Sequence, residues 1–228
     1  MSDLKLVVFD VDGTLIDSQD VIFEAMSRTF RRMNRPVPSK AKTLSVVGLS
    51  LEEAVAKIAP DLTDTEVIAG ADMYRRSFIE MRGETGGEAH APLYPGALSA
   101  LERLHSIDEI LLGVATGKAR RGLDHAYETH DIGHFFATSQ TADGHPSKPH
   151  PAMLESALFE TGCDAARAVM IGDTEFDIEM GKAAGFTTIA VSWGYHPLER
   201  LAGSSPDFII DDFYALHAVL DEIWAGSA

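Results

Sequence analysis

Short apolar runs alternate with amphipathic helical patterns through most of the chain, and this alternation constrains the fold more than any other feature. The runs are rich in β-branched and aromatic residues, and they lie at 4–9, 110–116, 168–171, 188–192 and 208–210. Helical patterns lie between most of them, at 96–106, 119–128, 151–161 and 175–184. Strands that alternate with helices form βαβ units, so the sequence predicts an α/β fold with a doubly wound parallel sheet.

Residues 17–86 break this alternation, because they contain three helical patterns and no convincing strand. In one of these patterns, apolar residues recur every three or four positions from Val67 to Phe78, which places them on one helix face. We therefore expect 17–86 to form a small all-helical insert after the first strand. Residues 1–16 and 87–228 are then expected to form the α/β unit.

Composition and charge exclude several classes of protein. Hydrophobic residues make up 45% of the 228 residues and charged residues 24%, which are ordinary globular values. With 35 acidic and 19 basic residues the net charge is -16, and so negative a surface repels nucleic acids and anionic membranes. The single Cys163 cannot form an internal disulfide, and no stretch has the length of a signal sequence or membrane span. We expect a cytoplasmic protein with a small-molecule partner; the sequence carries no signal for an oligomeric state.

Two aspartates stand where the first strand is expected to end, in the segment Asp10-Val-Asp12-Gly13-Thr14. Side chains two positions apart along an extended chain share a side, so both carboxylates can face one point beyond the strand. That point is where open α/β sheets bind their ligands. A lone aspartate there would more simply cap a loop, but two of them ahead of Gly-Thr favour a binding or catalytic site.

Three later segments place polar residues at matching positions. Thr116 and Gly117 close the second apolar run, where a hydroxyl and backbone N–H groups suit a phosphate oxygen. Lys148 precedes a helical pattern, and Asp173 and Asp177 follow the third apolar run. Taken singly, the threonine could be a helix cap, the lysine a solvated side chain and the second aspartate a helix-dipole partner. Together, the segments favour one shared site.

The charges of such a site require a cation. Carboxylates of Asp10, Asp12, Asp173 and Asp177 placed about 4 Å apart would repel one another by roughly 4 kcal/mol per pair at an effective dielectric constant of 20. A site of oxygen ligands with room for water and phosphate suits magnesium. Lys148 would neutralise the phosphate so that a carboxylate could approach it, as phosphoryl transfer requires.

In this order, the four segments resemble the four motifs of the haloacid dehalogenase superfamily of hydrolases. DVDGT resembles the first motif, Thr116 the second, Lys148 the third and GDTEFD the fourth. The resemblance covers essentially the whole chain and implies a Rossmann-like core, with residues 17–86 similar to the family's small helical cap. Within the superfamily the sequence is most similar to phosphoglycolate phosphatases and neighbouring small-sugar phosphatases.

The resemblance implies a catalytic role for each motif residue. Asp10 would be the nucleophile that accepts the phosphoryl group, and Asp12 the general acid that protonates the leaving oxygen and then activates water. Thr116 and the amide of Gly117 would hold phosphate oxygens, and Lys148 would stabilise the nucleophile and the transferring group.

The resemblance also implies the magnesium ligands and a contact from the insert. Magnesium would be bound by Asp10, the backbone carbonyl of Asp12 and Asp173, with Asp177 supporting through water or a hydrogen bond. Cap loops in the family close over the leaving group, so Gly48 could admit the substrate closely, although a plain turn fits it as well.

These observations together predict a magnesium-dependent phosphomonoester hydrolase that acts through an aspartyl-phosphate on a small phosphorylated metabolite, with phosphoglycolate as the first choice. One alternative is a sugar-phosphate mutase resembling β-phosphoglucomutase, which returns the phosphoryl group to its substrate. Others are a phospho-acceptor signalling module and a binding protein without catalysis. Asp12 argues against the dehalogenase branch, because halide displacement needs no acid for the leaving group.

Overall fold

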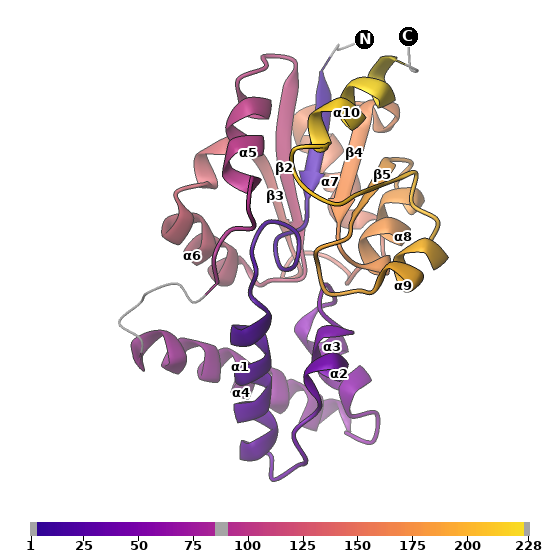
Figure 1. Ribbon diagram of the computed structural model, residues 1–228. Helices are drawn as coiled ribbons and strands as arrows, with labels where there is room; N and C mark the ends of the chain where they lie inside the picture. The colour runs from indigo at the N-terminus through magenta and orange to yellow at the C-terminus, as the bar shows by residue number, and fades with distance from the viewer. Residues whose placement is uncertain (1–3, 85–90, 226–228) are drawn as a thin grey trace.

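A six-stranded parallel sheet forms the centre of the protein, whose computed structural model describes residues 4–84 and 91–225 (Figure 1). The strand order is β3-β2-β1-β4-β5-β6, with every neighbouring pair parallel. The strands are β1 (Lys5–Phe9), β2 (Ile110–Thr116), β3 (Phe136–Thr141), β4 (Ala168–Gly172), β5 (Thr187–Val191) and β6 (Phe208–Ile210). The predicted α/β fold with a doubly wound parallel sheet is confirmed.

Strand β3 was not predicted, because its sequence FATSQT lacks a continuous apolar run. It lies at the edge of the sheet and pairs only with β2. Its buried positions include Thr138 and Gln140, whose side chains bond to each other rather than packing as hydrophobic groups. The other five strands lie where the apolar runs predicted them, with β5 displaced by one residue.

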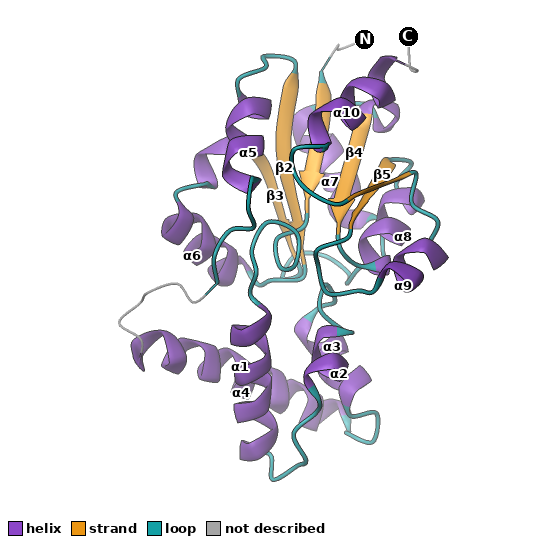
Figure 2. Cartoon of the chain, in the orientation of Figure 1, coloured by secondary structure: helices purple, strands orange, loops and turns teal. Residues whose placement is uncertain are grey.

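Helices cover both faces of the sheet, as Figure 2 shows. Val7 and Phe9 of β1 point into one hydrophobic cluster, and Leu6 and Val8 point into the other, as the alternation of a strand requires. The first cluster includes side chains of α5 (Ala97–His105), α6 (Arg120–His130) and α10 (Leu216–Ala225). The second includes α7 (Ala152–Thr161) and α8 (Glu175–Ala183), and the short helix α9 (Leu198–Gly203) packs beside α8.

Over its described residues, 17–84, the predicted insert contains four helices where three were predicted. They are α1 (Gln19–Arg32), α2 (Lys40–Leu44), α3 (Leu51–Ile58) and α4 (Asp64–Glu84). Helix α4 packs against α1 and α3, and the group lies below the sheet, apart from the helices that cover its faces (Figure 1). The predicted boundary between residues 86 and 87 lies outside the described residues. Over the part of the chain that is described, no helix is long and apolar enough to cross a membrane.

The sheet topology decides where functional side chains can meet. Strands β2 and β4 both pair with β1, on opposite sides of it, so the chain order changes direction at this point. The carboxyl ends of these three strands lead directly into Asp10, Thr116 and Asp173. Ligands of open α/β sheets bind at such a switch point, so the fold brings the predicted site residues to one edge.

Candidate active site

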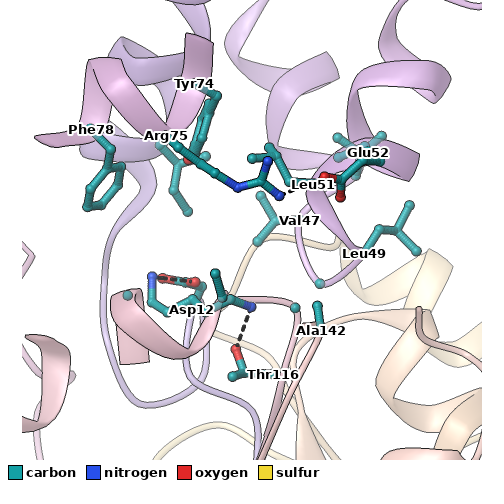
Figure 3. Close-up of a pocket in the computed structure, with 18 of the residues that line it drawn as sticks. Asp12, Val47, Leu49, Leu51, Glu52, Tyr74, Arg75, Phe78, Thr116 and Ala142 are labelled. Atoms are coloured by element: carbon teal, nitrogen blue, oxygen red, sulfur yellow. Dashed lines mark hydrogen bonds and ion pairs between the residues drawn. The ribbon is translucent and has the colours of Figure 1, made fainter. Parts of the chain in front are cut away.

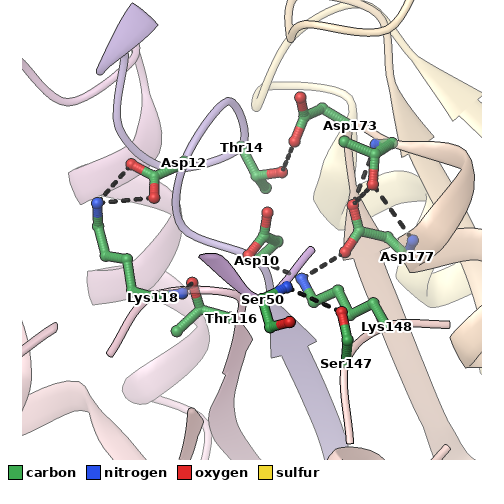
Figure 4. Close-up of polar contacts among 11 residues, drawn as sticks. Asp10, Asp12, Thr14, Ser50, Thr116, Lys118, Ser147, Lys148, Asp173 and Asp177 are labelled. Carbon is green, nitrogen blue, oxygen red and sulfur yellow. Dashed lines mark hydrogen bonds and ion pairs between the residues drawn. The ribbon is translucent and has the colours of Figure 1, made fainter. Parts of the chain in front are cut away.

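Lys148 connects two carboxylates at the centre of this edge. Its Nζ lies 2.9 Å from Oδ1 of Asp10 and 2.6 Å from Oδ1 of Asp177, and all three side chains are buried (Figure 4). Burial by itself would lower the pKa of Lys148, but the charges of the two aspartates raise it above its ordinary value. The lysine is therefore held as a cation within a buried acidic cluster.

Each carboxylate oxygen of Asp173 accepts a hydrogen bond that holds the side chain in place. Thr14 Oγ1 donates to its Oδ1 at 3.0 Å, and the backbone amide of Tyr195 donates to its Oδ2 at 2.8 Å. Gly13 has a φ of 90°, and a Cβ at that position would overlap the Asp173 carboxylate. The glycine after the two motif aspartates is thus required by both its backbone conformation and this close approach.

Asp177 lies in the first turn of α8, where it forms a capping box with Thr174. Its Oδ2 accepts hydrogen bonds from the Thr174 amide at 3.0 Å and from the Thr174 hydroxyl at 2.6 Å. Its Oδ1 faces Lys148. Asp177 therefore holds Lys148 and the start of α8 in place.

The acidic cluster suits a divalent cation. Carboxylate oxygens of Asp10, Asp173 and Asp177 lie within 4.8 Å of one another, and Oδ2 of Asp10 is buried without a partner among the described residues. Burial, helped by the neighbouring carboxylates, raises the pKa of Asp10 to about 7 and that of Asp173 well above its usual range. One lysine does not balance this negative charge. An oxygen-only donor set of this kind fits magnesium.

Asp12 turns away from this cluster and faces a different cation. Lys118 Nζ lies 2.7 Å from each of its carboxylate oxygens, as Figure 4 shows, and the Ser18 hydroxyl donates a further hydrogen bond. The Tyr195 hydroxyl lies 3.0 Å from that serine hydroxyl and accepts from the Ser18 amide at 2.9 Å. The two aspartates of the first motif therefore occupy different environments.

Thr116 and Gly117 bring the insert and the sheet together. Thr116 is buried, and its Oγ1 accepts from the Lys118 amide at 3.2 Å. Gly117 lies so close to the loop before α3 that a Cβ there would be 2.6 Å from the Gly48 carbonyl oxygen and 2.5 Å from that of Leu49. Gly48 has a φ of 98°, which accounts for the glycine in this turn.

A cavity of about 270 Å³ lies between the helical insert and the carboxyl edge of the sheet (Figure 3). Four of the predicted site residues contribute to its lower wall, namely Asp10, Asp12, Thr116 and Gly117, and Gly48 contributes from above. Lys148, Asp173 and Asp177 form the buried cluster beside it. The predicted residues therefore divide into a charged cluster and the wall of an adjoining cavity, with Asp10 in both.

Polar contacts hold the insert against the sheet in this arrangement. The Ser50 amide donates to Ser147 Oγ at 2.8 Å, beside Lys148. His196 Nε2 and an Arg200 guanidinium nitrogen each lie 3.2 Å from the Ser45 carbonyl oxygen. The loop from Ser45 to Ser50 thus covers the site.

Comparison with known proteins agrees with this geometry. A family model described as haloacid dehalogenase-like hydrolase matches residues 7–191. The chain belongs to this family. The predicted family is confirmed.

Curated relatives of this haloacid dehalogenase-like hydrolase match it over nearly its full length. It is 34% identical over 222 residues to the protein named "Probable phosphatase IndB" from Dickeya dadantii, with 94% of each chain covered. It is 31% identical to a phosphoglycolate phosphatase from Aliivibrio fischeri and 31% identical to the pyrophosphatase PpaX from Bacillus pumilus, in each case over 96% of this chain and 97% of the relative. These relatives confirm the predicted enzyme class, a phosphatase.

Solved structures of the family share the fold. A haloacid dehalogenase-like family protein from Streptococcus pneumoniae is 26% identical and superposes with a TM-score of 0.81, over 96% of this chain and 99% of that one. A structure from Clostridium acetobutylicum has a TM-score of 0.84 at 23% identity, over the same shares of the two chains.

Three residues around Asp12 in this haloacid dehalogenase-like hydrolase were not predicted as parts of the site. Lys118 stands two residues after Thr116, on the same strand-end loop, and this position was the only signal for it in the sequence. Ser18 and Tyr195 come from separate loops, 177 residues apart, and no sequence pattern links them. These residues set the environment of the carboxyl group predicted to act as an acid.

Proposed function

We propose that this enzyme is a magnesium-dependent phosphomonoester hydrolase that forms an aspartyl-phosphate on Asp10. The observation that supports this most strongly is the environment of the Asp10 carboxylate. One of its oxygens pairs with Lys148, the other is buried without a partner among the described residues, and the residue lines the same cavity as Asp12. A nucleophile and a separate acid thus border one space, as a two-step displacement requires.

In the first step, a carboxylate oxygen of Asp10 attacks phosphorus, and the bond between phosphorus and the ester oxygen breaks. The Asp12 carboxyl group gives its proton to that departing oxygen. Thr116 and the Gly117 amide hold phosphate oxygens, and the Lys148 ammonium offsets the charge that the carboxylate would otherwise meet.

In the second step, the Asp12 carboxylate takes a proton from water, and the water oxygen attacks phosphorus. The bond between phosphorus and Asp10 breaks, which releases phosphate and restores both carboxyl groups to their starting states. Lys118 and Ser18 stabilise the carboxylate form of Asp12 between the two steps, since both contact its oxygens.

Magnesium, when bound, would supply the positive charge that the acidic cluster lacks and would polarise the phosphoryl group. Asp10, Asp173 and the backbone carbonyl of Asp12 would hold it, and Asp177 would support it through Lys148. The Asp10 oxygen that has no partner in the described part of the chain and the raised pKa of Asp173 support this assignment.

We further propose that residues 17–86 act as a cap over a core made of 1–16 and 87–228. The contact between Ser50 and Ser147 and the cavity enclosed beside Asp10 support a covering role. Closure of such a cap would exclude bulk water until the phosphoryl group has been transferred.

Phosphate release from a panel of phosphate monoesters and pyrophosphate, with and without magnesium, tests this function. The panel contains phosphoglycolate and pyrophosphate, since relatives are named for these substrates. We expect magnesium-dependent release that Asp10→Asn lowers by roughly 10⁴-fold or more with the fold intact. Magnesium at a hundred times its dissociation constant should stabilise the protein by about 2.7 kcal/mol, and Asp173→Asn should weaken that stabilisation. Isomerisation without release would identify a mutase instead.

A further inference from the structure

The cavity beside Asp12 is walled mainly by hydrophobic side chains. They come from α1, α3, α4 and the loop before α3, and they include Met26, Val47, Leu51, Tyr74, Phe78 and Ile79. Figure 3 shows several of them converging above Thr116. Because the ester oxygen must lie near Asp12 during reaction, the group attached to that oxygen extends into this apolar space.

The cations that line the cavity are already engaged, apart from one at its rim. Arg75 pairs with Glu52 at 2.6 Å and with Asp72 at 3.0 Å, and Lys118 pairs with Asp12. Among the described residues, Arg121 is the lining cation without an ion pair, and it is exposed. Within the described part of the chain, no unpaired and buried cation therefore lines the cavity to bind an anionic leaving group.

The carboxylates in the wall make an additional anion still less favourable. Asp12, Glu52 and Asp143 line the cavity, and Asp10, which also lines it, is paired with Lys148. The phosphate end of a substrate is compensated by Lys148 and a metal ion, but a carboxylate on the leaving group would meet these acids among apolar side chains. Desolvating such a group without a partner is costly.

The volume of the cavity also exceeds what a two-carbon acid fills. About 270 Å³ approaches the lower limit of roughly 300 Å³ for pockets that hold drug-sized ligands. Phosphoglycolate places its phosphoryl group against Asp10, Thr116 and Gly117, so only its two-carbon acid would extend towards the hydrophobic wall and part of that wall would stay in contact with water.

We propose that the enzyme selects monophosphates whose leaving group is apolar and carries no carboxylate. This inference rests on the proposed phosphatase function, names the substrate class of the same site and departs from phosphoglycolate, the first choice from the sequence. Each methylene group buried against the hydrophobic wall stabilises the bound substrate. The arginine and lysine in the wall are already paired with acids, so they do not stabilise an additional negative charge.

Two matched substrate series test the proposal. One consists of n-alkyl monophosphates from ethyl to hexyl, and the other of carboxyl-terminated monophosphates of the same chain lengths, beginning with phosphoglycolate. We expect kcat/KM to rise about fourfold per methylene in the alkyl series until the cavity is filled. Each carboxyl-terminated partner should be about tenfold or more poorer. A flat alkyl series, or faster turnover of phosphoglycolate than of ethyl phosphate, would overturn the proposal.

Variants of one helix sharpen the test. Ile79 of α4 lines the cavity and is 43% exposed, so Ile79→Lys adds a cation without disturbing the core. It should raise the preference for carboxyl-terminated substrates, whereas Ile68→Lys, on the same helix outside the cavity wall, should not. Selective loss of phosphoglycolate turnover in Arg121→Gln would count against an apolar class. Failure of every ester, or release that persists in Asp10→Asn, would instead reject the phosphatase function itself.

Discussion

The ammonium group of Lys148 lies 2.9 Å from a carboxylate oxygen of Asp10, and both side chains are buried. The negative charges of the acids stabilise the buried cation, and its positive charge in turn stabilises their ionised forms. This mutual dependence makes the lysine a determinant of stability as well as of catalysis.

Replacement of Lys148 by methionine should therefore destabilise the protein strongly. The change leaves buried, uncompensated carboxylates, and the free energy of unfolding in magnesium-free urea titrations should fall by about 3–5 kcal/mol. Lys40→Met is the control, because Lys40 pairs with Asp20 at the surface and should cost less than about 1 kcal/mol. Similar unfolding midpoints for the two variants would argue against the buried charge network.

Asp12→Asn should discriminate between leaving groups. An alkoxide needs a proton as it departs, whereas p-nitrophenolate does not, so kcat/KM for butyl phosphate should fall roughly 10²- to 10⁴-fold and that for p-nitrophenyl phosphate much less. The quantity kcat/KM is the relevant one because it reports the steps up to phospho-enzyme formation. Equal losses on the two esters would show that Asp12 is not the acid.

Gly117→Ala should separate the covering loop from the core. The added Cβ would be 2.6 Å from the Gly48 carbonyl oxygen, so the loop must move outward. We expect kcat/KM to fall by about 10²-fold while the free energy of unfolding changes little. Gly144→Ala provides the control, because a Cβ there meets nothing within 4 Å. Wild-type kinetics in Gly117→Ala would mean that the contact between loop and core is dispensable.

His196 predicts a pH dependence of stability. Its Nδ1 accepts from the Glu175 amide and its Nε2 donates to the Ser45 carbonyl, which requires a neutral ring. Burial, assisted by Arg200, lowers its pKa from 6.5 to about 4. The unfolded chain therefore binds a proton more readily, and the stability contributed by the neutral ring is complete above pH 6.5 and lost as the pH falls towards 4.

Unfolding titrations of the wild type and His196→Gln between pH 7 and 4 measure this effect. The stability advantage of the wild type should shrink by up to roughly 3 kcal/mol over that range. His134→Gln, at an exposed position, is the control for the loss of one histidine. A constant difference between wild type and His196→Gln would show that folding does not lower the pKa of this ring.

Much of the sheet could be predicted from sequence because five of its strands are apolar runs. Strand β3 could not, since an edge strand with buried Thr138 and Gln140 has no hydrophobic signature. Helix α2 was missed among the insert helices because five residues, KAKTL, are too few to establish a helical period.

The site residues that could be predicted from the sequence are mainly those whose positions are determined by the end of a strand. Asp10, Thr116 and Asp173 each end or follow a central strand, so the topology alone brings them to one edge. Lys118 and Ser18 meet Asp12 only through the paths of two loops. The apolar wall of the cavity depends on how three helices and the loop before α3 pack together, which no local sequence pattern contains.

Chemical trapping of the phospho-enzyme tests the central role of Asp10 most directly. Enzyme mixed with magnesium and substrate is quenched within one turnover, reduced with borohydride and mapped by peptide mass spectrometry. An acyl phosphate on Asp10 is reduced to homoserine, so we expect homoserine at position 10 in samples that contained substrate and none in samples without it. Rapid turnover with an unmodified aspartate at position 10, or with the modification at another carboxylate, would show that Asp10 is not the nucleophile.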